Sequence, residues 1–214
     1  MLFKEVTIYD QQLPLNGHVM KPSQPVKAWI IFSHGSGSSR KSQRNNWVAH
    51  ELNEKGFGTL LFDLLTIEED NDDLNRFNIP LLARRLMKAT YWLQNDQDYH
   101  QEKIAFFGAS TGAAAALVAA SDLQSICPLY AIVCRGGRPD LAGSTVLSTL
   151  SIPTLLIVGS KDEEVISLNE KAHDELSYSK LVLVQGATHL FEEEGALQEV
   201  VDLSADWLDH HLRN

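Results

Sequence analysis

Cysteine is scarce in this chain of 214 residues, which contains only Cys127 and Cys134. Their spacing fits neither a CxxC redox pair nor a zinc site, so a disulfide scaffold or a zinc-binding module is not expected. Two cysteines in a chain of this length indicate free thiols in a reducing compartment, with a single disulfide as the open alternative. We therefore expect a cytoplasmic protein.

Positive charge is also in deficit, because 18 lysines and arginines face 28 aspartates and glutamates, for a net charge of -10. No basic stripe is present, so neither a nucleic-acid partner nor binding to an anionic membrane is expected. Long apolar runs are missing as well. Lys4 and Glu5 interrupt the N-terminal segment, which argues against a signal peptide, and no window reaches the length of a transmembrane helix.

Short apolar runs instead alternate with longer amphipathic stretches. The first two runs, 3–9 and 17–21, flank the turn-like segment LPLNG (13–17) and predict a hairpin. Further strands are predicted at 28–34, 58–64, 103–109, 129–135, 154–160 and 180–186, and helices at 42–55, 79–96, 111–120, 163–176 and 193–212. This order predicts a single α/β domain over residues 1–214, with a doubly wound, mostly parallel sheet of about eight strands.

Three connecting features complete this prediction. The acidic run from Thr66 to Asn75 is expected to be a solvated loop, and Arg84 and Arg85 are expected on a basic face of the helix at 79–96. The segment 136–152 is too short for a cap domain, which predicts an open site. In doubly wound sheets the functional residues lie at the carboxyl ends of the strands. Those positions hold His34, Gly35, Asp63, Ser110, Arg135, Asp162 and His189.

The sequence Gly108-Ala109-Ser110-Thr111-Gly112 lies between a predicted strand and a predicted helix. This is the G-x-S-x-G pattern of a nucleophile elbow, in which a strained turn points the serine hydroxyl outward. A side chain at either glycine would collide with the adjoining strand or helix. A Gly-Ser turn without chemistry is the alternative, and the flanking strand and helix favour the nucleophile.

A serine nucleophile needs a base, and in this arrangement an acid and a histidine follow it in the chain. Asp162 and His189 each stand just past a predicted strand, in the required order. Asp140, after the sixth strand, is the rival acid. The other histidines considered are interpreted as surface or structural residues: His18, His100, His173, His210 and His211.

The segments HGSG, GASTG, VGSKDEEV and GATHLF together resemble the α/β-hydrolase superfamily. Within it, the chain is similar to small dienelactone-hydrolase-like proteins, including the domain sometimes fused to phosphoribosyltransferases. The resemblance implies Ser110 as nucleophile, Asp162 as orienting acid and His189 as general base, with no metal or cofactor. Dienelactone hydrolases proper use a cysteine nucleophile, whereas this chain has Ser110.

The loop Gly-Ser-Gly-Ser-Ser-Arg-Lys-Ser, which starts at Gly35, allows two interpretations. It matches the phosphate-binding pattern G-x-x-x-x-G-K-[ST] except that Arg40 replaces the last glycine. In the hydrolase architecture the same loop lies beside the elbow, where the N–H groups of Ser36 and Thr111 would form an oxyanion hole. The second interpretation is favoured because it also accounts for the residues at the other strand ends. Lys41 and Arg44 then belong to a solvated helix start.

These features predict a serine hydrolase that cleaves a small-molecule ester, lactone or thioester through an acyl-enzyme. A non-catalytic binding module, or an acyltransferase or peptidase with the same residues, is the alternative. Arg135 and Arg138 in CRGGRPD are candidates to bind an anionic group of the substrate. They would otherwise form an internal salt bridge to Asp140 or to the acidic run. The sequence does not set the oligomeric state.

Overall fold

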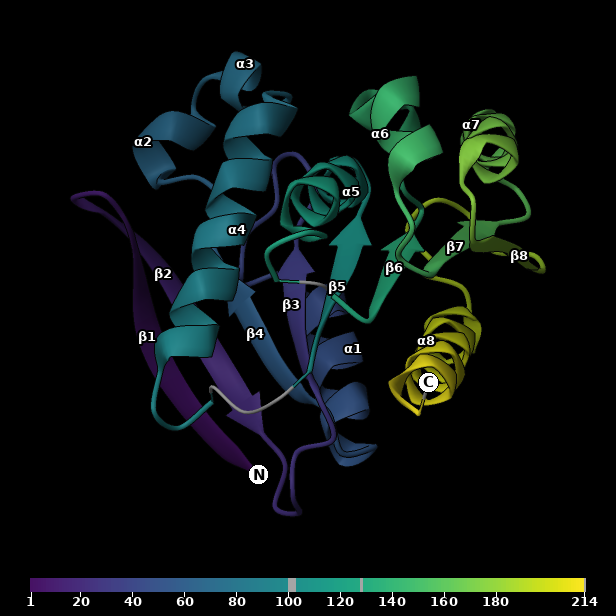
Figure 1. Ribbon diagram of the computed structural model, residues 1–214. Helices are drawn as coiled ribbons and strands as arrows, with labels where there is room; N and C mark the ends of the chain where they lie inside the picture. The colour runs from purple at the N-terminus through teal and green to yellow at the C-terminus, as the bar shows by residue number, and fades with distance from the viewer. Residues whose placement is uncertain (100–102, 128, 214) are drawn as a thin grey trace.

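The computed structural model describes residues 1–99, 103–127 and 129–213, so His100 lies outside the described residues. Eight strands in these ranges form one sheet in the order β1-β2-β4-β3-β5-β6-β7-β8 (Figure 1). The strands are β1 (Leu2–Asp10), β2 (Leu13–Lys21), β3 (Trp29–Ser33), β4 (Gly58–Phe62), β5 (Ile104–Ala109), β6 (Ala131–Arg135), β7 (Thr154–Gly159) and β8 (Ser179–Val184). Strand β2 pairs antiparallel with β1 and β4, and all other pairs are parallel. The predicted fold class is confirmed.

Helices cover both faces of the sheet, and each face has its own apolar core (Figure 1). The longer helices are α1 (Gln43–Glu54), α4 (Ile79–Asn95), α5 (Thr111–Leu123), α7 (Glu163–Glu175) and α8 (Ala196–Leu212). Helices α1 and α8 pack on one face, and α4, α5 and α7 on the other. Strand β3 alternates between the two cores, since Ile30 and Phe32 face α1 while Ile31 faces α4.

The connection from β6 to β7 contains two short helices instead of the expected plain loop, the 3-10 helix η1 (Pro139–Ala142) and α6 (Ser144–Thr149). It carries no cap domain, as predicted. Across the described residues, none of the helices combines the length and the apolarity that crossing a membrane requires.

The N-terminal hairpin exists, but the predicted position of its turn is wrong. The chain reverses at Gln11 and Gln12, and β2 continues through Pro14 and Gly17. Gly17 serves a close strand contact instead of a turn, because a Cβ atom there would lie 3.0 Å from the Cβ of Phe62. The turn itself is made by Gln11 with a φ of 59°.

The acidic run forms two short helices, α2 (Ile67–Asp70) and α3 (Asp73–Arg76), and is not the expected loop. Thr66 begins α2 with a capping box, in which its hydroxyl and the Glu69 carboxylate each accept a backbone N–H. Neither helix contains a buried residue. Ile67, Leu74 and Phe77 are exposed, so ionic and hydrogen-bonded contacts, and not an apolar core, hold this segment.

Arg85 is only 2% exposed, so it does not belong to the expected basic face of α4. Its Nη2 atom lies 2.6 Å from Oε1 of Glu69, and its Nε atom lies 3.4 Å from Oδ2 of the buried Asp10. Arg84, which is exposed, contacts the same Asp10 oxygen at 3.0 Å. This ion cluster joins β1, α2 and α4. The spacing of apolar and charged residues within α4 cannot reveal it, because the partners come from distant segments.

The charges in the cluster change the pKa values of its carboxyl groups. Burial alone would raise the pKa of Asp10, but hydrogen bonds and charges from Arg84 and Arg85 outweigh it and lower that pKa. Hydrogen bonds from Arg85 lower the pKa of Glu69. A lowered carboxyl pKa stabilises the fold at pH values above the ordinary carboxyl pKa. This stabilisation is lost as the pH falls through the folded-state pKa.

We expect Arg85→Met to lower the free energy of unfolding at pH 7 by about 3–5 kcal/mol, because it leaves buried carboxylate charge without its partner. Part of the stability loss that the native protein shows on acidification should also disappear. Urea unfolding at pH 7 and in steps down to pH 3 measures both effects. The matched control is Arg84→Met on the exposed side, with an expected loss of about 1 kcal/mol or less. Equal losses in the two variants would contradict the assignment.

Candidate active site

Ser110 connects β5 to α5 in a strained conformation, with φ 52° and ψ −124°. Two glycines make this turn sterically possible. A Cβ atom at Gly112 would lie 2.1 Å from the Ser33 carbonyl oxygen, and one at Gly108 would lie 2.5 Å from the Cα of Ala113. The backbones of β3, β5 and α5 therefore meet around Ser110, which is the steric arrangement expected from the G-x-S-x-G pattern.

His189 follows β8 and Asp162 precedes α7, and the structure brings these two side chains together. The Nδ1–H of His189 donates to Oδ2 of Asp162 over 2.6 Å. The rival acid Asp140 is engaged elsewhere, since both of its carboxylate oxygens accept from Arg138, at 2.9 and 2.8 Å. Of the two acids considered, Asp162 is thus the one that orients the His189 ring.

Ser110 and His189 line one cavity of about 260 Å³. The other lining residues are Gly35, Ser36, Ser38, Ser42, Arg44, Asn45, Ala109, Arg135 and Leu190. Gly136, with a φ of 51°, packs closely against His189. A Cβ atom at this position would lie 3.2 Å from the His189 carbonyl oxygen. The sequence-predicted serine and histidine therefore face the same space.

The loop after β3 lies directly against the elbow, as expected. A Cβ atom at Gly35 would lie 3.0 Å from the Cβ of Ser110. The next residue differs from the expectation, because the Ser36 N–H donates to Oγ1 of Thr111 over 2.8 Å. Ser36 and Thr111 are thus neighbours, but one predicted oxyanion donor is bonded to the side chain of the other residue. The Thr111 N–H belongs to the first turn of α5, where helix geometry offers no acceptor.

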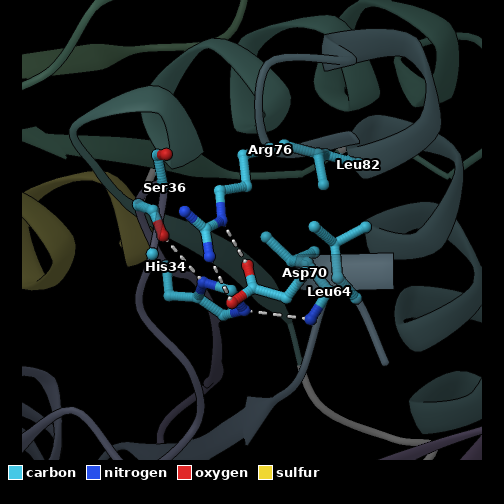
Figure 2. A pocket seen from close by; sticks show the side chains of 9 residues that line it. His34, Ser36, Leu64, Asp70, Arg76 and Leu82 are labelled. Carbon is cyan, nitrogen blue, oxygen red and sulfur yellow. Dashed lines mark hydrogen bonds and ion pairs between the residues drawn. The ribbon is translucent and has the colours of Figure 1, made fainter. Parts of the chain in front are cut away.

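His34 contacts this loop, and the sequence placed it at a strand end without assigning it a specific role. Its Nε2 accepts the Leu64 N–H at 3.0 Å, so Nδ1 carries the proton and donates to the Gly35 carbonyl oxygen at 3.0 Å. Burial lowers the pKa of His34, which favours this neutral form. Figure 2 shows the His34 ring beside the ion pair of Asp70 and Arg76, so the α2–α3 segment borders the loop.

Arg40, the residue that breaks the phosphate-loop pattern, is bound to Asp63 at the end of β4. Its backbone N–H donates to Oδ1 of Asp63 over 2.8 Å, and its Nε lies 3.2 Å from Oδ2. Glu5 lies 3.7 Å from the same guanidinium. Two carboxylates at this position oppose a bound phosphate, which agrees with the preference for the oxyanion interpretation.

The two candidate substrate-binding arginines have different surroundings. Arg138 forms the internal salt bridge to Asp140 that was the alternative expectation for it. Arg135 lines the cavity of Ser110 and His189, and its Nη2 donates to Oδ1 of Asn45 over 3.2 Å. Sequence reasoning missed Asn45 and assigned its neighbour Arg44 to a solvated helix start. No local pattern distinguishes a cavity-lining asparagine from any other helical asparagine.

The remaining described histidines that were considered do not line this cavity. His18 contacts Asn46 at 3.0 Å and His173 contacts Ser179 at 2.7 Å, while the buried His211 packs edge-on against Trp207. Within the described ranges, no group of three or more potential metal ligands is placed to hold an ion.

Because strain at residue 110 is released when the side chain is removed, we expect Ser110→Gly to unfold with a higher free energy than Ser110→Ala. The difference should be about 1–2 kcal/mol, since strain of roughly 1–3 kcal/mol is partly offset by the flexibility of unfolded glycine. Paired denaturant titrations of the two variants measure it. A more stable alanine variant would show that the turn is unstrained.

Residues 26–204 match the family model of the alpha/beta hydrolase domain. A crystal structure of "Dienelactone hydrolase" from Anabaena variabilis is 45% identical, with a TM-score of 0.91 over 98% of this chain and 97% of that one. Est1E from Butyrivibrio proteoclasticus shares the fold at 15% identity, with a TM-score of 0.83 over 98% and 99% of the two chains. The chain is 48% identical over 210 residues to a "Putative phosphoribosyl transferase" of Mycobacterium tuberculosis. That match covers 98% of this chain but 46% of the relative, so the chain spans about half the length of this curated relative.

Proposed function

The chain belongs to the α/β-hydrolase domain family, and on that premise we propose that it is a serine hydrolase with Ser110 as its nucleophile. The observation that carries the proposal is the strained serine that shares a cavity with a histidine bonded to a carboxylate. A free hydroxyl is a weak nucleophile, and a histidine held in one tautomer is the base that activates it.

In the proposed reaction, Oγ of Ser110 attacks the substrate carbonyl carbon while Nε2 of His189 takes its proton. Asp162 holds Nδ1–H of His189 and stabilises the imidazolium that forms. When the tetrahedral intermediate collapses, the C–O or C–S bond breaks and the proton passes from Nε2 to the leaving group. Water then repeats the sequence on the acyl-enzyme, releases the acid and restores Ser110.

The developing oxyanion is proposed to accept the N–H groups of Thr111 and Ser36. The Thr111 hydroxyl holds the Ser36 N–H in its position before the substrate arrives. The oxyanion then takes the place of that hydroxyl as acceptor, and Oγ1 rotates away. One such donor contributes about 3 kcal/mol to lowering the barrier.

The substrate is proposed to be a small ester, lactone or thioester. The connection between β6 and β7 carries no cap domain, which favours a small substrate over the long acyl chain of a lipase substrate. The Anabaena variabilis neighbour, at 45% identity, bears the name of an enzyme that hydrolyses a lactone. The Mycobacterium tuberculosis relative is about twice as long as this chain. Its name therefore gives no reason to propose a transferase activity for the half that matches this chain.

A fluorophosphonate probe is expected to label the folded protein at Ser110, because an activated serine attacks phosphorus as it attacks a carbonyl carbon. Mass spectrometry of the digested adduct locates the modification. Ser110→Ala should remove labelling completely while circular dichroism shows an unchanged fold. Folded protein that stays unlabelled, or carries the adduct at another residue, would refute the proposal and favour a binding module.

Asp162→Asn is expected to lower kcat for an activated ester by roughly 10⁴-fold, because an amide at this position favours the wrong His189 tautomer. Asp140→Asn is the matched control, since this acid contacts Arg138 and not the histidine. The control should keep kcat within about threefold of the parent. Initial rates on a small ester panel decide the matter, and the reverse ranking of the two variants would assign the acid to Asp140.

A further inference from the structure

Arg135 is a buried cation without an anionic partner. The residue is 9% exposed, and its Nη1 atom is buried without any hydrogen bond. Among the described residues, the one side chain that accepts a hydrogen bond from this guanidinium is the neutral amide of Asn45. Within the described residues, no carboxylate lies within ion-pair distance of Arg135, whereas Arg138 has one such partner and Arg85 has two.

The position of Arg135 is fixed relative to the nucleophile. Arg135 is the last residue of β6 and pairs with Ala109 of β5, the residue before Ser110. The Ser110 N–H donates to the Arg135 carbonyl oxygen over 3.3 Å. Adjacent strands lie about 5 Å apart, so the backbone that carries the guanidinium is a single strand spacing from the elbow. Both side chains line the same cavity.

The side chains that α1 and the loop before it contribute to the cavity are cationic or polar. Arg44 and Asn45 come from the first turn of α1, a helix of 12 residues, and the hydroxyls of Ser38 and Ser42 border the same space. None of the described residues that line the cavity is acidic. The α1 N-terminus contributes further positive potential, because the backbone N–H groups of the first turn point outward.

The surroundings of Arg135 disfavour its positive charge. Burial, with a smaller contribution from the Arg44 charge, lowers the pKa of Arg135 to about 10. A buried cation is normally paired with an anion or fully hydrogen-bonded, and Arg135 has neither arrangement. Arg44, by contrast, is balanced at the surface by Glu192, 2.8 Å from its Nη1.

We propose that Arg135, assisted by Arg44 and the N-terminus of α1, binds a carboxylate or phosphate group of the substrate within the cavity of Ser110. An oxyanion there would accept from the Arg135 guanidinium and would give it the anionic partner that the described residues do not supply. The guanidinium fork suits carboxylate and phosphate because it can bond two oxygens at once. This proposal rests on the proposed function, because it treats the anion as part of a substrate that the protein hydrolyses. It narrows the proposed substrates to short anionic acyl compounds.

The first experiment measures anion binding without turnover. Inorganic phosphate and acetate are titrated into the Ser110→Ala protein by calorimetry, and at least one of them should bind. Adding Arg135→Gln should weaken binding about 10- to 100-fold, the effect expected for one hydrogen bond to a charged group. Arg138→Gln, whose side chain pairs with Asp140, is the matched control and should leave binding unchanged. Absence of binding by both anions, or equal weakening in both arginine variants, would overturn the proposal.

If Arg135→Gln does not fold, Arg44→Gln supplies the test from the half-exposed side of the cavity. Its expected effect on anion binding is about three- to tenfold, since its charge is partly balanced and screened. An unchanged affinity in this variant would overturn the contribution of Arg44 and, with it, the site as proposed. Comparison of the two anions decides whether the cavity prefers the planar carboxylate or the tetrahedral phosphate.

The second experiment compares two activated esters of similar size, one ending in a carboxylate and one in a methyl group. Arg135→Gln should lower kcat/KM for the anionic ester about 10- to 100-fold, through KM, and spare the neutral one. Equal losses on both esters would make Arg135 structural and refute the anionic substrate. A further outcome is that the protein binds the anions but remains unlabelled by a fluorophosphonate. That result would support the anion site and refute only the proposed serine hydrolase activity.

Discussion

The close approach between the end of β3 and the first turn of α5 is the contact on which the site depends. A Cβ atom at Gly112 would lie 2.1 Å from the Ser33 carbonyl oxygen, so only glycine allows the two backbones to meet. This contact forces Ser110 into its positive φ and places Gly35 beside it. It also brings the Thr111 hydroxyl within 2.8 Å of the Ser36 N–H. Ser110, the loop after β3 and the N-terminus of α5 are therefore a single steric unit.

The residues that line the cavity beside this unit differ in charge from the chain as a whole. The protein carries a net charge of -10, yet the described residues that line the cavity include two arginines and no acid. Asp63, which follows β4, does not line this cavity and is paired with Arg40. A locally positive cleft in an acidic protein attracts small anions, while the overall charge repels polyanions such as nucleic acids.

The fold and the chemical core of the site were predictable because their signals are local. Buried parallel strands appear as continuous apolar runs, and the elbow needs small residues at fixed positions around Ser110. Features that depend on tertiary neighbours were not predictable. Gly17 resembled a turn glycine but fits a strand contact, and Arg85 resembled a surface residue until Asp10 and Glu69 were brought to it. Asn45 became part of the site only because the fold brings the first turn of α1 within reach of the Arg135 side chain.

The α2–α3 segment differs from the rest of the structure in what holds it. Neither helix buries a residue, and the ion pair of Glu69 with Arg85 joins the segment to α4, while Asp70 and Arg76 pair within the segment. Such a unit can open without unfolding the sheet, because few apolar contacts are lost when it detaches. It borders His34 and the loop that carries Ser36. The Glu69–Arg85 pair that holds the segment is largely buried, so salt screens this pair weakly, whereas protonation of Glu69 in acid removes its charge. Acidity, and not ionic strength, therefore acts on the loop that carries Ser36 through a segment that does not line the Ser110 cavity.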